Sequence, residues 1–65
     1  MKLIVNGEEI NTESKTVDNL LNELDINENV MGVAVNMSVV KKEDWKSFKF
    51  SENDKVELLQ FVGGG

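Results

Sequence analysis

The sequence predicts an α+β domain in which one main helix packs on one face of a mixed sheet of four to five strands. Three observations predict this fold class. Apolar side chains recur at helical spacing from Val17 to Leu24. The pair Asn6-Gly7, a strong signal for a tight turn, separates two strand-like runs near the start. A further strand-like run, residues 55–62, directly precedes three glycines.

Residues 1–12 are expected to form a β-hairpin. The run 2–5 carries β-branched side chains, and residues 8–11 can return beside it. Asn-Gly suits a type I′ turn because both central residues of that turn need a positive φ. Alternation along the first strand then places Met1, Leu3 and Val5 in the core and Lys2, Ile4 and Asn6 on the outward face.

A helix is expected from Thr16, its N-cap, to about Leu24. The Thr16 hydroxyl can accept a hydrogen bond from a free backbone N–H of the first turn, and Asp18 is well placed for the helix dipole. One apolar stripe along the helix consists of Val17, Leu20, Leu21 and Leu24. Residues 25–29 then connect the helix to the next strand, with Ile26 expected to point inward.

The second half is expected to complete the sheet. Residues 33–36 form a short strand with Val39-Val40 as its neighbour, and a charged turn ends in the only tryptophan, Trp45, which covers one end of the core. Phe48 and Phe50 lie in an extended segment. The last strand, from about Lys55 to Val62, pairs beside the first. A ubiquitin-like β-grasp has this order of elements, so residues 1–62 are predicted to be a single β-grasp domain and residues 63–65 a flexible glycine tail.

The composition argues against several kinds of site. The 65 residues include no cysteine and no histidine, so neither disulfides nor Cys/His zinc sites can form. Acidic pairs such as Glu43-Asp44 are adjacent, and in a strand they would point to opposite faces, so no metal site is predicted. The net charge of −5, with no arginine, disfavours nucleic acid and anionic membranes as partners. No run is apolar enough for a membrane span or a signal peptide, which predicts a cytoplasmic protein.

The three glycines Gly63, Gly64 and Gly65 have two interpretations. Glycine lacks a β-carbon, so a glycine tail can pass through a narrow channel and carry its carboxylate into another protein's active site. Alternatively, the glycines are a frayed chain end. Their attachment to a β-grasp pattern favours the first interpretation.

Six segments, in order over nearly the whole chain, together resemble a known family. They are Val5-Asn6-Gly7-Glu8, Thr16-Val17 with Leu20-Leu21, Val33-Ala34-Val35-Asn36, Val39-Val40 with the charged turn to Trp45, Asp54-Lys55-Val56-Glu57, and Val62-Gly63-Gly64-Gly65. This pattern resembles the ThiS family of sulfur carriers in thiamin biosynthesis, and the ending after a Val-x-Glu strand is its most specific part. The chain departs from the family at Met37, where many relatives carry glycine, and at Lys41-Lys42, where they carry proline or arginine.

The resemblance implies that the carboxylate of Gly65 is adenylated, converted to a thiocarboxylate and used to deliver sulfur to the thiazole ring of thiamin. Gly64 and, less strictly, Gly63 would give the tail clearance inside a partner. The implied partners are a ThiF-type, E1-like adenylyltransferase that uses ATP, a ThiG-type thiazole synthase and a cysteine-derived sulfur donor. No cofactor is expected on the carrier itself.

The chain lacks the groups that these steps need. It has no cysteine to hold a persulfide, no histidine base and no glycine-rich loop with lysine to bind ATP phosphates. It is therefore expected to be a protein substrate or carrier rather than an enzyme. Two alternatives remain: a sulfur carrier for another pathway, such as molybdopterin synthesis or tRNA thiolation, and a ubiquitin-like protein modifier.

Alternation in the last strand predicts a docking surface. Val56 and Leu58 are assigned to the core, which leaves Glu57, Leu59 and Phe61 on the open face of the sheet. Ile4 on the first strand could extend this face, so Ile4, Leu59 and Phe61 are predicted to contact a partner. Isolated exposed apolar side chains are also ordinary, and a slip of one residue in the register would exchange the two faces.

Overall fold

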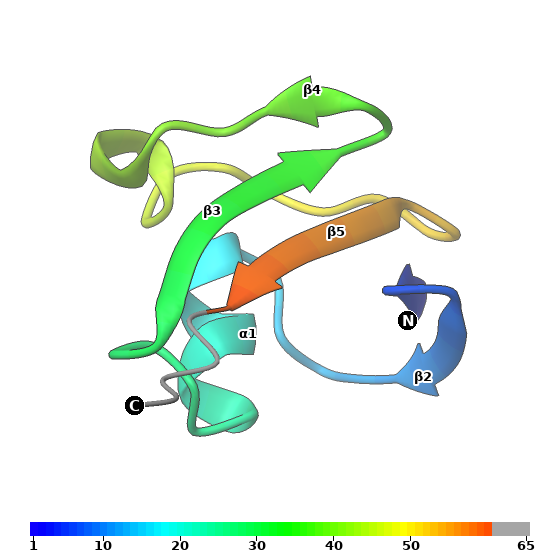
Figure 1. Cartoon of the computed structure of the whole chain (residues 1–65). Helices are drawn as coiled ribbons and strands as arrows, with labels where there is room; N and C mark the ends of the chain where they lie inside the picture. The colour runs from blue at the N-terminus through cyan, green and yellow to red at the C-terminus, as the bar shows by residue number, and fades with distance from the viewer. Residues whose placement is uncertain (61–65) are drawn as a thin grey trace.

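The structure, a computed structural model, describes residues 1–60 of the chain, and residues 61–65 lie outside the described part. The elements in chain order are β1 (Lys2–Val5), β2 (Glu8–Asn11), α1 (Val17–Glu23), β3 (Val30–Val35), β4 (Ser38–Val39), the short 3₁₀ helix η1 (Lys42–Asp44) and β5 (Lys55–Gln60). The strands form one five-stranded sheet in the order β2-β1-β5-β3-β4. The helix α1 lies across one face of this sheet, behind β3 and β5 in Figure 1.

The strand β5 lies in the middle of the sheet although it is the last strand in the sequence. It runs parallel to β1, with Val5 opposite Val56, and antiparallel to β3, with Val33 opposite Leu58. The predicted pairing of the last strand beside the first is therefore confirmed. A mixed sheet with one helix on one face is the predicted ubiquitin-like β-grasp.

The first hairpin forms as predicted. Val5 pairs with Glu8 across a two-residue loop in which Asn6 has φ 49° and Gly7 has φ 86°, as a type I′ turn requires. Leu3 and Val5 are buried on the helix side. The prediction that Met1 faces the core is wrong, because this residue precedes β1, and 37% of its surface is exposed at the rim of a polar depression.

The helix begins as predicted and ends one residue early. The Thr16 side chain accepts a hydrogen bond from the backbone N–H of Asn19 at 3.1 Å. The fully buried helix residues are Val17, Leu20 and Leu21. Leu24 was expected on the same stripe, but it follows the last helical residue and is 37% exposed. The next residue, Asp25, has φ 58°, which turns the chain away from the helix axis.

The third strand is longer than predicted and the fourth is shifted. β3 begins at Val30 rather than at residue 33. Its register with β5 shifts between Val30 and Gly32, at the exposed Met31, and the strand continues on both sides of this irregularity. In β4 the paired residues are Ser38 and Val39, while Val40 follows the strand and is buried.

Aromatic side chains cover the end of the core beyond β4. Trp45 is buried, as predicted, and its indole N–H donates to the backbone carbonyl of Val40 at 3.0 Å. Phe50 is buried and Phe48 partly buried, with their rings in an edge-to-face contact at 6.1 Å. The core therefore consists of α1, the inner face of the sheet and this aromatic segment.

Candidate functional site

The two faces of β5 have the predicted assignment. Val56 is fully buried and Leu58 partly buried on the side of α1. Glu57 and Leu59 therefore lie on the opposite, open face of the sheet, and Leu59 is 64% exposed. A large apolar side chain thus stands in solvent near the end of the central strand.

Leu59 belongs to a shallow apolar depression on the open face. In the sheet register Leu59 pairs with Gly32, and Ala34 pairs with Val39, which is 79% exposed. These four residues share a depression of about 370 Å³, and we call them the Leu59 patch. Because Gly32 and Ala34 on β3 are small, the protein surface between Leu59 and Val39 is recessed. Glu57 lies at its edge.

Ile4 lies on the same face as Leu59 but not in this patch. It is half-buried and pairs with Lys55, four residues before Leu59 along β5. Four residues of a strand span about 13 Å, and Ile4 does not line the depression. The structure therefore places the two residues at opposite ends of β5. Phe61, the third predicted contact residue, and the tail residues Gly63, Gly64 and Gly65 lie outside the described residues.

Three members of the patch, Gly32, Ala34 and Val39, were not predicted from the sequence. Alternation in Val33-Ala34-Val35 carried a signal for Ala34, since two inward valines leave the residue between them on the open face. Gly32 and Val39 gave no such signal, because their positions depend on the β3 irregularity and on the shifted β4 register.

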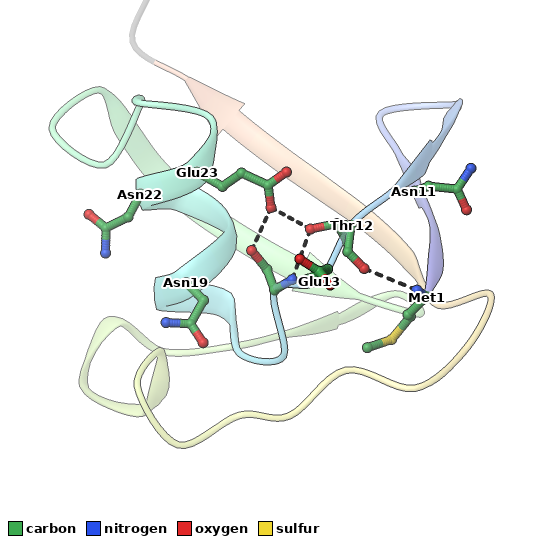
Figure 2. Close-up of a pocket in the computed structure, with 8 residues that line it drawn as sticks. Met1, Asn11, Thr12, Glu13, Asn19, Asn22 and Glu23 are labelled. Carbon is green, nitrogen blue, oxygen red and sulfur yellow. Dashed lines mark hydrogen bonds between the residues drawn. The ribbon is translucent and has the colours of Figure 1, made fainter.

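A second, polar depression of about 830 Å³ lies where the β2–α1 connection meets the helix. Figure 2 shows Thr12 beside the Glu23 carboxylate. The hydroxyls of Thr12 and Ser14 both donate to this carboxylate, the latter at 2.6 Å. The backbone N–H of Ser14 in turn donates to the Thr12 hydroxyl at 2.9 Å. These bonds, from Ser14 first and Thr12 second, lower the pKa of Glu23 below its ordinary value.

This network joins the β2–α1 connection to the last turn of α1. Within residues 1–60, no buried side-chain nitrogen or oxygen lacks a hydrogen-bond partner. In the same residues no three side chains of the ligating types gather to hold a metal ion. The polar depression accordingly contains a hydrogen-bonded network that ties the β2–α1 connection to the helix.

Comparison with known proteins decides the family. The model of the ThiS family matches residues 3–65, which is nearly the whole chain and includes the glycine tail. The chain belongs to the ThiS family. The resemblance predicted from the sequence is therefore confirmed.

Solved and curated relatives of this ThiS-family chain agree with the assignment. The crystal structure of the thiamine biosynthesis protein ThiS from Geobacter metallireducens is 33% identical, with a TM-score of 0.81 over the whole of both chains. The uncharacterized protein ycf40 of Trieres chinensis is 34% identical over 94% of this chain and 85% of its own length. A thiazole synthase of Paramagnetospirillum magneticum is 39% identical over the whole of this chain, which spans only 20% of that protein.

The family and the solved structure support the predicted role of a small sulfur carrier in thiamin biosynthesis. Among residues 1–60, no helix has the length and apolar character needed to span a membrane.

Proposed function

We propose that this ThiS-family chain carries sulfur as a thiocarboxylate on Gly65 and delivers it for formation of the thiazole ring of thiamin. The observation that carries the proposal is the family match, which runs through the three glycines to residue 65. A domain similar to this chain forms part of a protein named thiazole synthase, which supports thiazole formation as the destination of the sulfur.

The chemistry requires activation because a carboxylate repels nucleophiles and has no leaving group. In the proposed route the Gly65 carboxylate attacks the α-phosphorus of ATP and pyrophosphate leaves. Hydrosulfide released from the sulfur donor then attacks the acyl carbon of the adenylate, AMP leaves, and the thiocarboxylate forms. The carrier has no cysteine and no histidine, so an E1-like adenylyltransferase and a cysteine-derived sulfur donor supply the catalytic groups and the sulfur. The only group of the carrier that reacts is its terminal carbonyl.

The Leu59 patch is the proposed contact surface for these partner enzymes. It is apolar, its members Leu59 and Val39 are exposed, and Leu59 lies on β5, the described strand that comes before Gly65 in the sequence. Because Gly63 and Gly64 have no side chains, the tail itself contributes clearance rather than affinity. A separate apolar surface on the folded domain would therefore provide the binding energy.

Intact-mass spectrometry tests the function. The purified chain is incubated with the adenylyltransferase of its own organism, ATP, magnesium and a sulfur donor. The expected product is heavier by the difference between one sulfur and one oxygen atom, and fragmentation places the change at Gly65. Removal of Gly65, or Gly64→Val, should abolish this product while thermal unfolding of the domain is unchanged. An unaltered mass with the authentic enzyme, or sulfur at another residue, would refute the proposal.

The same experiment separates the alternatives. Transfer of sulfur from the loaded chain to a thiazole synthase supports the thiamin pathway. Transfer only to another acceptor enzyme, or an isopeptide bond to lysine, would favour a different carrier pathway or a protein modifier.

A further inference from the structure

The end of β5 is held to β1 by a side chain rather than by the backbone. Along the parallel pair, the backbone N–H of Ile4 donates to the carbonyl of Asp54 at 2.9 Å, and that of Asn6 donates to Val56 at 2.8 Å. The next donor on this edge of β5 is the N–H of Leu58. It donates to the side-chain carbonyl of Asn6 at 2.8 Å, across 52 residues of sequence.

The reason lies in the first turn. Asn6 has φ 49° and opens the two-residue loop to β2, so the backbone of β1 leaves the sheet directly after Val5, the last residue paired with β5. The parallel ladder would therefore stop two residues short of Leu58. The Asn6 amide oxygen replaces the missing backbone acceptor and extends the ladder by one rung.

The hydrogen bond between Leu58 and Asn6 lies beside a loosely packed part of the domain. A depression of about 310 Å³, lined by Ile10, Leu24, Leu58 and Gln60 among others, lies beside it on the helix side of the sheet. Leu24 at its rim is 37% exposed. Leu58 itself packs partly against the core, and on its other edge the end of β5 pairs with β3 as far as Gln60. Beyond Val56, the edge of β5 that faces β1 is therefore held by this side-chain hydrogen bond from Asn6.

A second asparagine makes an equivalent contact at the opposite end of the strand. Asn36, with φ 51°, opens the β3–β4 turn. Its backbone N–H donates to the carbonyl of Lys55 at 2.7 Å, and its side-chain carbonyl accepts from the N–H of Lys55 at 3.0 Å. Both asparagines thus bind β5 through backbone and side chain, Asn36 at its start and Asn6 near its end. Only Asn6 is close to the residues that lead to Gly65.

We propose that Asn6 is a positioning residue for loading of the carrier: its bond to Leu58 fixes the β1 edge of β5 at the residues that come just before the reactive tail in the sequence. The inference rests on the proposed function of Gly65. When the β1 edge of β5 is open, the carrier is not in the conformation that the adenylyltransferase binds. The apparent affinity for this enzyme therefore falls by the fraction of chains in which the edge is closed.

Three variants isolate the side-chain bond. Asn6→Gly removes the acceptor and still tolerates the positive φ, while Asn6→Asp keeps both an acceptor oxygen and tolerance of that φ. Asn36→Gly removes the equivalent bond at the start of β5 and serves as the matched control. Amide hydrogen exchange at Leu58 and Lys55 is measured by NMR, and adenylation is followed as pyrophosphate release over a range of carrier concentrations.

In Asn6→Gly, exchange at Leu58 should accelerate roughly fivefold, as the loss of one net hydrogen bond predicts. KM for the carrier should rise roughly two- to fivefold with kcat unchanged. Asn6→Asp should restore both values. Asn36→Gly should accelerate exchange at Lys55 and leave KM as in the wild type.

A rise in KM of the same size in Asn36→Gly would overturn the positioning role, because the effect would then reflect stability alone. Wild-type loading by Asn6→Gly, or failure of Asn6→Asp to restore KM, would overturn it as well. A wild-type chain that is never adenylated would instead refute the proposed function itself, so the two failures are distinguishable.

Discussion

The substitution Met37→Gly should stabilise the fold. Met37 is the second residue of the β3–β4 turn and has φ 72°, a conformation in which a β-carbon crowds the backbone. Its side chain is 93% exposed, so it contributes almost no buried area in return. The first turn has the favoured arrangement, with Gly7 at the corresponding position and φ 86°.

The size of the effect follows from two opposing terms. Relief of the left-handed conformation favours the folded Met37→Gly chain by about 1–2 kcal/mol. The greater freedom of glycine in the unfolded chain offsets about 0.4–1 kcal/mol of this. The free energy of unfolding should therefore rise by roughly 0.5–1 kcal/mol, which raises the melting temperature of a domain of this size by roughly 2–8 °C.

Denaturant and thermal unfolding followed by circular dichroism measure this difference, and Met37→Ala is the matched control. Alanine removes the same exposed side chain but keeps the β-carbon, so its stability should stay within about 0.5 kcal/mol of the wild type. Equal stabilities of the glycine and alanine variants would show that the backbone conformation of Met37 carries no strain.

Three further predictions follow from the described residues. Leu20→Ala should lower the free energy of unfolding by about 2–5 kcal/mol in urea, because the side chain is fully buried; a loss below 1 kcal/mol would contradict this packing. Glu23 has a lowered pKa in the folded chain, so its contribution is complete above the unfolded pKa and is lost as pH falls through the folded one. Glu23→Gln should accordingly flatten the decline of stability as the pH falls from above the ordinary pKa of glutamate to below the lowered pKa of Glu23, and an unchanged decline would count against the network. Leu59→Asp should leave stability within about 0.5 kcal/mol and raise KM for the adenylyltransferase, whereas Met37→Asp, at a more exposed residue outside the patch, should not raise it.

Local sequence signals predicted the elements whose geometry is decided by neighbouring residues. The Asn6-Gly7 turn and the Thr16 cap depend on a few consecutive positions, and both form as predicted. Inward alternation in β5 was also correct, since a central strand packed on a helix needs one apolar face. The errors at Met1 and Leu24 fall one residue outside an element, where the periodic pattern continues in the sequence but the backbone does not.

The candidate site was less predictable because it is assembled from separate strands. Leu59 was expected on the open face, but its neighbours Gly32 and Val39 come from β3 and β4 and are selected by register. Ile4 was grouped with Leu59 because adjacent strands were correctly inferred, yet their offset along β5 was not. The bond between Asn6 and Leu58 spans 52 residues, and no local pattern indicates it.

The position of β5 has a consequence for biosynthesis of the carrier. The hairpins β1–β2 and β3–β4 do not pair with one another, and each reaches the sheet only through β5. While the ribosome is still adding residues 55–60, the nascent polypeptide therefore has two unconnected hairpins and no shared sheet. Folding must wait for the final strand to emerge, which leaves prematurely terminated products open to proteolysis. Truncated chains that lack β5 should therefore fail to present a folded domain to the activating enzyme.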